Sequence, residues 1–234
     1  MSQIRPDTHV ADLVVEQPAR ARVFERFGID YCCGGKTPLE TACAERGLDV
    51  GVVAAALAEP GSGEAEDIDW KDASVGELVE HIVGQHHAYL REELPPLGAL
   101  VEKVARAHGD AHPELEEVRE AFGAVQQELS SHMLKEEQIL FPACLTLAGD
   151  GEAHFAFGSV SAPIGAMLHE HDEVAGLLLR LRELTAGYEP PADACNSYRS
   201  MLDRLETLER DTHRHVHEEN NVLFPRALAL ESAR

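Results

Sequence analysis

The stretch His132-Met133-Leu134-Lys135-Glu136-Glu137-Gln138-Ile139-Leu140-Phe141-Pro142 carries a spacing, His-x3-Glu-x3-Leu-Phe-Pro, that occurs twice in the chain. The second copy joins His215 to Glu219 and then to Leu223-Phe224-Pro225. On a helix, an i, i+4 spacing places the histidine and the glutamate on one face, about 6 Å apart along the axis. Two such pairs on two helices of one bundle can bring imidazoles and carboxylates to one interior point, as in di-iron and di-manganese bundles.

The second half of the chain predicts long helices without strand-like alternation. A capping box at Ser74-Val75-Gly76-Glu77 opens the first helix, in which Pro95 and Pro96 should produce a kink or a break. Three more helices are expected over about 114–141, 164–186 and 193–224, with Pro142 and Pro225 ending the second and the fourth. We therefore predict an all-α protein with an antiparallel four-helix bundle across 70–234.

The N-terminal residues 1–58 predict a small helical domain. Thr8 is expected to cap a helix over 10–16, and Pro18 to open a second helix that ends at Gly28. Thr37 to Glu40 reads as a capping box, and Asp49 as the cap of a last short helix. Residues 59–69 are rich in Gly, Glu and Asp and predict a linker. So small a domain favours docking on a partner surface.

Two further histidines match the repeat. His87 and His132 lie at similar distances from the reversal between their helices, and His171 and His215 do the same in the second half. In an antiparallel hairpin such residues lie at one height, so four histidines and two glutamates should share one layer of the bundle. Mixed imidazole and carboxylate ligands suit non-haem iron or manganese better than structural zinc. We predict that Glu136 and Glu219 bridge two metals, with the histidines as terminal ligands and with positions left for water, oxide, O2 or NO.

Other polar residues near the repeat allow two interpretations. Glu128 and Asp211 lie one turn before the repeated histidines, and Glu170 precedes His171. All three are candidates for a second shell or channel, and solvated acidic residues are the alternative. Five other histidines are predicted not to be ligands, because they lie off the interior face or, for the last of them, near a reversal; they are His86, His169, His213, His217 and His108.

The net charge of −22 argues against binding to nucleic acid or to an anionic membrane surface. No apolar run approaches the length of a membrane span, and no signal peptide is evident. The five cysteines include an adjacent pair, Cys32 and Cys33, which favours free thiols in a reducing cytoplasm. That pair, followed by two glycines, is either a reactive or metal-transferring thiol pair or two cysteines packed in a turn. The other three are expected to be small core residues: Cys43, Cys144 and Cys195.

These segments resemble the haemerythrin-like proteins, and specifically the di-iron Repair of Iron Centres family. The resemblance rests on the stretches 27–35, 91–95, 132–142, 170–173 and 219–225 and covers essentially the whole chain. It implies an oxo- or hydroxo-bridged centre of two non-haem iron ions in a bacterial cytosolic protein. The ligands that it implies are His87, His132, Glu136, His171, His215 and Glu219. The family's paired cysteines correspond to Cys32 and Cys33.

The resemblance implies a role in repairing iron–sulfur clusters damaged by nitrosative or oxidative stress, through supply of iron. The protein's partners would be apo or damaged iron–sulfur proteins, and NO or O2 would be its small ligands. The protein would be a monomer or a homodimer. The cysteines would aid docking or thiol transfer. Two alternatives use the same bundle: an enzyme that reduces NO to N2O, and an O2- or NO-binding sensor. The N-terminal domain favours repair, because simple gas binding does not need it.

Overall fold

The structure, a computed structural model, describes residues 4–60, 70, 72–149, 151 and 153–234. Within these residues the regular elements are helices, and the β-structure amounts to two isolated bridges. The chain divides into two compact units, one made of residues 1–79 with 213–234 and the other of residues 80–212. Each unit is described by itself. Among the described residues, no helix is both long enough and apolar enough to span a bilayer.

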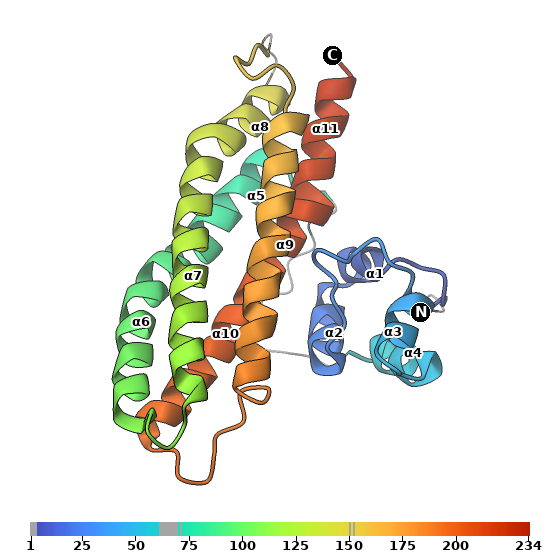
Figure 1. Cartoon of the computed structure of the whole chain (residues 1–234). Helices are drawn as coiled ribbons and strands as arrows, with labels where there is room; N and C mark the ends of the chain where they lie inside the picture. Colours follow the sequence, from blue (N-terminus) through green and yellow to red (C-terminus); the bar gives the residue numbers. More distant parts are fainter. Residues whose placement is uncertain (1–3, 61–69, 71, 150, 152) are drawn as a thin grey trace. The chain divides into compact units, whose positions relative to one another are not determined.

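Residues 80–212 form an antiparallel four-helix bundle (Figure 1). Its helices are α6 (Ala88–His108), α7 (Glu114–Lys135), α9 (Ser161–Leu184) and the part of α10 (Asn196–Glu218) that lies before residue 213. Buried apolar side chains recur every three or four residues on each helix, as Leu90, Leu94, Leu97 and Val101 do on α6. This periodicity gives each helix one buried stripe, which confirms the all-α bundle that the sequence predicts.

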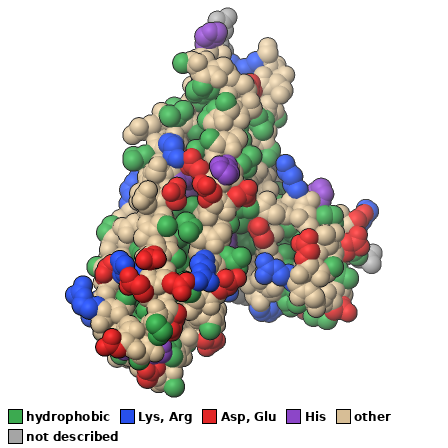
Figure 2. Space-filling model, in the orientation of Figure 1, with side chains coloured by type: hydrophobic (Ala, Val, Ile, Leu, Met, Phe, Trp, Pro, Cys, Tyr) green, Lys and Arg blue, Asp and Glu red, His purple; other side chains and the backbone are tan. Residues whose placement is uncertain are grey.

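Ion pairs connect neighbouring helices around this bundle. Arg119 on α7 reaches Glu102 on α6 at 3.2 Å, and Arg180 on α9 pairs with Glu117 on α7. Two more pairs attach α10: Arg182 donates two hydrogen bonds to Glu209, and Arg204 Nε lies 2.6 Å from Glu93. Figure 2 shows acidic and basic side chains interspersed on the visible surface. The exposed pairs of Arg119 and Arg180 contribute little stability, whereas Glu209 is a buried carboxylate that Arg182 satisfies.

Of the kink or break expected at Pro95 and Pro96, the break is absent, because α6 runs without interruption from Ala88 to His108. Each proline removes a backbone N–H and so leaves the carbonyl four residues earlier without its helical donor. Those carbonyls belong to Arg91 and Glu92, which are exposed, as are the two prolines. Water can therefore satisfy them.

The prolines of the repeat do not end their helices, which corrects the predicted ends of both. After α7 the chain forms a π-helical segment, η3 (Glu136–Leu140), and then continues as α8 (Phe141–Ala148). The second copy repeats this with η4 (Glu219–Leu223) and α11 (Phe224–Ser232). Pro142 and Pro225 fall in the first turn after the π segment, where the hydrogen-bonding register changes and proline is tolerated. A third π segment, η2 (Ile82–His87), follows α5 (Val75–His81).

The N-terminal part of the other unit is a set of short helices: α1 (Val10–Glu16), η1 (Pro18–Arg20), α2 (Ala21–Phe27), α3 (Leu39–Glu45) and α4 (Val50–Ala58). They enclose a core of their own around Phe24, Leu39 and Leu57. Gly28 ends α2 with a φ of 65°, as predicted for a glycine at this position.

The predicted helix caps are partly right. Asp49 accepts hydrogen bonds from the amides of Gly51 and Val52, and Ser74 and Glu77 form the expected capping box. Thr8 and Thr37 do not cap, because α1 and α3 begin one residue later than each threonine requires, after His9 and Pro38. Of the predicted linker, residues 61–69 lie outside the described residues.

Candidate metal centre

The polar residues of the repeat occupy the positions that apolar side chains fill elsewhere on the same helices. On α7, Leu115, Val118, Phe122, Val125 and Leu129 lead in steps of three and four to His132 and then to Glu136. On α9, His171 stands between buried Met167 and Val174. All three polar side chains are buried, Glu136 completely so. Because burying such groups in an apolar stripe is costly, their positions mark a functional site.

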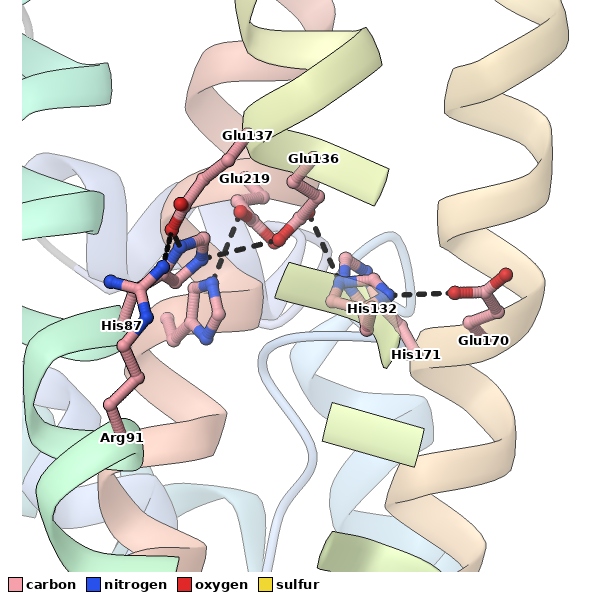
Figure 3. A network of polar contacts seen from close by, with 9 residues as sticks. His87, Arg91, His132, Glu136, Glu137, Glu170, His171 and Glu219 are labelled. Atoms are coloured by element: carbon pink, nitrogen blue, oxygen red, sulfur yellow. Dashed lines mark hydrogen bonds and ion pairs between the residues drawn. The ribbon is translucent and has the colours of Figure 1, made fainter. Parts of the chain in front are cut away.

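Glu136 is the centre of this cluster (Figure 3). One of its carboxylate oxygens lies 3.2 Å from Nε2 of His87, and the other lies 3.1 Å from Nε2 of His132. Neither carboxylate oxygen makes a hydrogen bond of acceptable geometry among the described residues. His171 joins the cluster from α9, with its Nε2 3.0 Å from Nε2 of His132. The structure thus brings together four of the six predicted ligands within one unit.

Two of these imidazoles are each oriented by a separate carboxylate, which contacts the ring nitrogen that points away from Glu136. Nδ1 of His87 lies 2.6 Å from Glu137, which also pairs with Arg91. Nδ1 of His132 lies 2.9 Å from Glu170. Since an ionised carboxylate only accepts hydrogen bonds, Nδ1 of each ring carries a proton, and Nε2 is the nitrogen directed at Glu136.

The surroundings keep these two orienting carboxylates ionised. Burial alone would raise the pKa of Glu137, but hydrogen bonds from His87 and Arg91 outweigh it and lower the pKa below its usual value. Burial likewise opposes ionisation of Glu170, and hydrogen bonds from Lys135 and then His132 lower its pKa. Both carboxylates therefore remain acceptors at neutral pH.

The resulting arrangement fits a metal cation. Nε2 of His87 and Nε2 of His132 lie 3.2 and 3.1 Å from the oxygens of a buried carboxylate, and Nε2 of His171 lies 3.0 Å from Nε2 of His132. A cation that replaced the protons among these atoms would be attracted to all of them. Imidazole rings tied through Nδ1 to a carboxylate are also the usual ligand geometry in metalloproteins. The residues present thus form a set of His and Glu donors that could hold a metal ion.

The second copy of the repeat lies in the other unit. His215 is near the end of α10, and Glu219 is the first residue of η4. Both side chains are buried, and His215 Nε2 lies 3.1 Å from Glu219 Oε1. This pair reproduces the contact between His132 and Glu136, and in both copies the glutamate begins a π-helical segment. π-helical turns occur frequently at functional sites.

The three predicted second-shell residues have different places. Glu170 contacts the ring of His132, as described. Glu128 is half-buried, and among the described residues it forms no hydrogen bond or ion pair. Asp211 contacts a histidine that we did not predict as a ligand, since its Oδ1 lies 2.9 Å from Nδ1 of His86.

His108, also predicted not to be a ligand, lies near the end of α6 with its Nε2 3.2 Å from the sulfur of Cys195. Cys195 was expected in the core, but it is exposed.

Sequence reasoning missed Glu137, Arg91 and Lys135, which complete the hydrogen bonds around the imidazoles. The sequence feature that could have identified Glu137 is that it directly follows the predicted ligand Glu136. On a regular α-helix that place points to a different face from Glu136, and the π-helical segment that begins here alters the register.

The two adjacent cysteines lie in a tight turn. Asp30 accepts hydrogen bonds from the amides of Cys32, Cys33 and Gly34, and its carboxylate lies 3.2 Å from the sulfur of Cys32. The two sulfur atoms are 4.0 Å apart and unbonded. Hydrogen bonding to Cys33, then burial and the charge of Asp30, raise the pKa of Cys32 well above its usual value. Cys32 is therefore a protonated thiol at neutral pH and a poor nucleophile.

This turn packs on the segment that carries His215 and Glu219, inside the same unit. His217 Nδ1 lies 3.2 Å from the carbonyl oxygen of Tyr31, and the Asn221 amide donates to the carbonyl oxygen of Cys32 at 3.1 Å. Gly35 permits this approach, because a Cβ there would lie 2.6 Å from Ala11 Cβ and 3.0 Å from Asn221 Oδ1. His217, predicted not to be a ligand, thus has a structural role on the opposite side of the helix.

Comparisons with known proteins agree with this geometry. The Hemerythrin HHE cation binding domain matches residues 78–227, and the ScdA_N domain, a domain of unknown function, matches residues 6–60. The chain is 38% identical over 225 residues to the iron–sulfur cluster repair protein YtfE of Enterobacter sp. (strain 638). It is 39% identical over 225 residues to the protein of the same name from Escherichia coli O157:H7. Each alignment covers 96% of this chain and 98% of the relative. The chain therefore belongs to the YtfE family of hemerythrin-like proteins.

Proposed function

We propose that this protein repairs damaged iron–sulfur clusters and that it holds two non-haem iron ions for this purpose. The proposed ligands are His87, His132, Glu136, His171, His215 and Glu219. Glu136 and Glu219 would bridge the two ions, and the four histidines would be terminal ligands. The YtfE relatives are named for cluster repair, and the match to them runs over almost the whole chain.

The contact set of Glu136 is the observation that carries the metal assignment. A fully buried carboxylate faces two imidazole nitrogens, and the opposite nitrogens of both imidazoles contact Glu137 and Glu170. Histidine and carboxylate donors together favour iron or manganese over structural zinc. The repeated His-x3-Glu pair at His215 supports equal contributions from the two halves.

An iron centre of this kind would supply iron for reassembly of a cluster and would bind small ligands such as NO or O2. The protein's own residues set how firmly the ions are held. Glu137 and Glu170 keep the Nδ1 proton on His87 and His132, and so maintain their Nε2 lone pairs for binding. Arg91 and Lys135 hold these two carboxylates in place from the exposed side.

We propose that apo or damaged iron–sulfur proteins dock at the turn that carries Cys32 and Cys33. Burial and a raised pKa make Cys32 unsuited to nucleophilic thiol chemistry, whereas Cys33 is partly exposed beside it. We propose a cytoplasmic location, where unbonded thiols persist, and a monomer or homodimer. The domain limits that we propose remain 1–58, 59–69 and 70–234.

The test is repair of a client cluster. An iron–sulfur enzyme whose cluster has been damaged by NO is incubated anaerobically with the iron-loaded protein, and its activity is followed. Recovery that requires the loaded protein, and that is lost in the Glu136→Leu variant, would support the proposal. Equal recovery with free iron alone would refute it. Multiple-turnover formation of N2O from NO would instead identify an NO-reducing enzyme.

A further inference from the structure

A second group of imidazoles lies beside the centre, on the helical segment that leads to His87. His81 ends α5, and His86 lies near the end of the π-helical segment η2. Their rings are in an edge-to-face arrangement with centroids 5.5 Å apart, and ring nitrogens of the two lie within 4.8 Å of each other. His86 is buried, and His81 is half-buried, so solvent reaches the pair from one side.

The π-helical segment creates this pair. In a regular α-helix, residues five apart point about 140° away from each other. In a π-helix the hydrogen bonds run from i to i+5, which brings residues five apart onto one face. His81 and His86 are related in this way across η2. A sequence interpretation based on regular helices therefore places them on different faces.

Asp211 orients His86 in the same manner as Glu137 and Glu170 orient the imidazoles of the main centre. Its Oδ1 lies 2.9 Å from Nδ1 of His86, and its side chain is 24% exposed. The proton therefore belongs on Nδ1, and Nε2 is left as a lone-pair donor. This carboxylate–imidazole contact is the arrangement that usually supports a metal-bound histidine.

We propose that His81 and His86 form a second cation site, oriented by Asp211, for a divalent transition-metal ion. Two nitrogens that bind one ion at the usual distance of 2.0–2.1 Å lie about 3.4 Å apart in tetrahedral geometry. In the structure a ring nitrogen of each histidine lies within 4.8 Å of one on the other, so binding of one ion by both would require their side chains to rotate toward each other. Imidazole ligands favour ions such as Fe²⁺, Co²⁺, Ni²⁺ and Zn²⁺ over Mg²⁺ and Ca²⁺. Water would fill the remaining positions on the partly exposed side.

Anaerobic titration of the metal-free full-length protein with Co²⁺ tests this site. Bound metal is measured by equilibrium dialysis with metal analysis, and folding of each variant is checked by circular dichroism. We expect His81→Ala to bind one equivalent less than the wild type. Asp211→Asn should keep the site but weaken it about 10- to 100-fold, as expected when an orienting carboxylate is lost. The matched control is His169→Ala, which removes an exposed imidazole that lies 3.6 Å from Glu173, and it should bind as the wild type does.

The same titration in a Glu136→Leu background separates the two sites. The equivalent of Co²⁺ that depends on His81 should persist there, whether or not the main centre still binds Co²⁺. Equal stoichiometry in the wild type and His81→Ala would overturn the proposal. So would loss of that equivalent in Glu136→Leu alone, because the ion would then belong to the main centre. Unchanged affinity in Asp211→Asn would overturn the orienting role.

Discussion

Replacing Glu136 by leucine should change the stability of the chain in opposite directions with and without metal. Glu136 is fully buried, and neither of its oxygens makes a hydrogen bond among the described residues. A buried carboxyl group without hydrogen bonds destabilises the folded state unless a bound cation compensates it. Leucine has a similar volume and restores the apolar stripe that runs along α7.

The expected magnitudes follow from these two states. Replacing buried ionic groups by apolar residues of similar size stabilises proteins by up to about 4 kcal/mol, so the metal-free variant should gain roughly 2 kcal/mol. For a chain of this length that gain raises Tm by about 4–8 °C. Iron at a free concentration of 1,000 times Kd should stabilise the wild type by about 4 kcal/mol, a gain that the variant lacks wholly or in part. The order of melting temperatures should therefore invert when iron is added.

The assay is thermal unfolding of both proteins with a chelator and with excess Fe²⁺ under anaerobic conditions. Iron content is measured in parallel and should be lost or halved in the variant. Glu128→Leu is the matched control, since it makes the same substitution on the same helix at a half-buried carboxylate. It should shift both melting curves alike. If Glu136→Leu lowered Tm equally with and without iron, Glu136 would be a structural residue and the metal assignment would fail.

Three other outcomes are expected. Glu219→Leu should also remove or halve bound iron without unfolding the protein, and full iron occupancy in both glutamate variants would exclude a bridging role. Cys32→Ala/Cys33→Ala should retain its iron but repair a damaged client enzyme poorly, and undiminished recovery would exclude the docking role of the turn. Hydrogen bonds from the Tyr198 amide and then from His108 lower the pKa of Cys195 to about 7. Its alkylation, followed by peptide mass spectrometry, should therefore accelerate as pH rises through about 7, and a midpoint near 9 would contradict the contact with His108.

The bundle and its central residues are readable from the sequence because they depend on periodicity. His132, Glu136 and His171 stand at stripe positions otherwise filled by leucine, valine and methionine, so spacing alone selects them. The orienting carboxylates are harder to predict. Glu170 could be predicted because it is adjacent to His171 in the sequence. Asp211 contacts His86 on another helix, and this contact depends on how the helices pack.

The helix break predicted at Pro95 and Pro96 and the helix ends predicted at Pro142 and Pro225 are wrong for a local reason. A proline in a helical pattern usually marks an end, but the consequence depends on whether water can satisfy the carbonyls that it leaves without a donor. At Pro95 and Pro96 those carbonyls lie on the exposed face. At Pro142 and Pro225 the hydrogen-bonding register changes just before the proline. Neither circumstance can be seen from residue type alone.

The π-helical segments connect these observations. In each copy of the repeat, the π-helical segment begins at the glutamate, and the π-helical segment η2 ends at His87. A π turn places more residues in each turn than an α-helix and so shifts which side chains share a face. This shift lets Glu136 face inward while Glu137 reaches His87, and it pairs His81 with His86. The Leu-Phe-Pro ending of the motif then restarts the α-helix with proline in its first turn. The repeated sequence thus encodes a proposed ligand together with the local distortion that positions its neighbours.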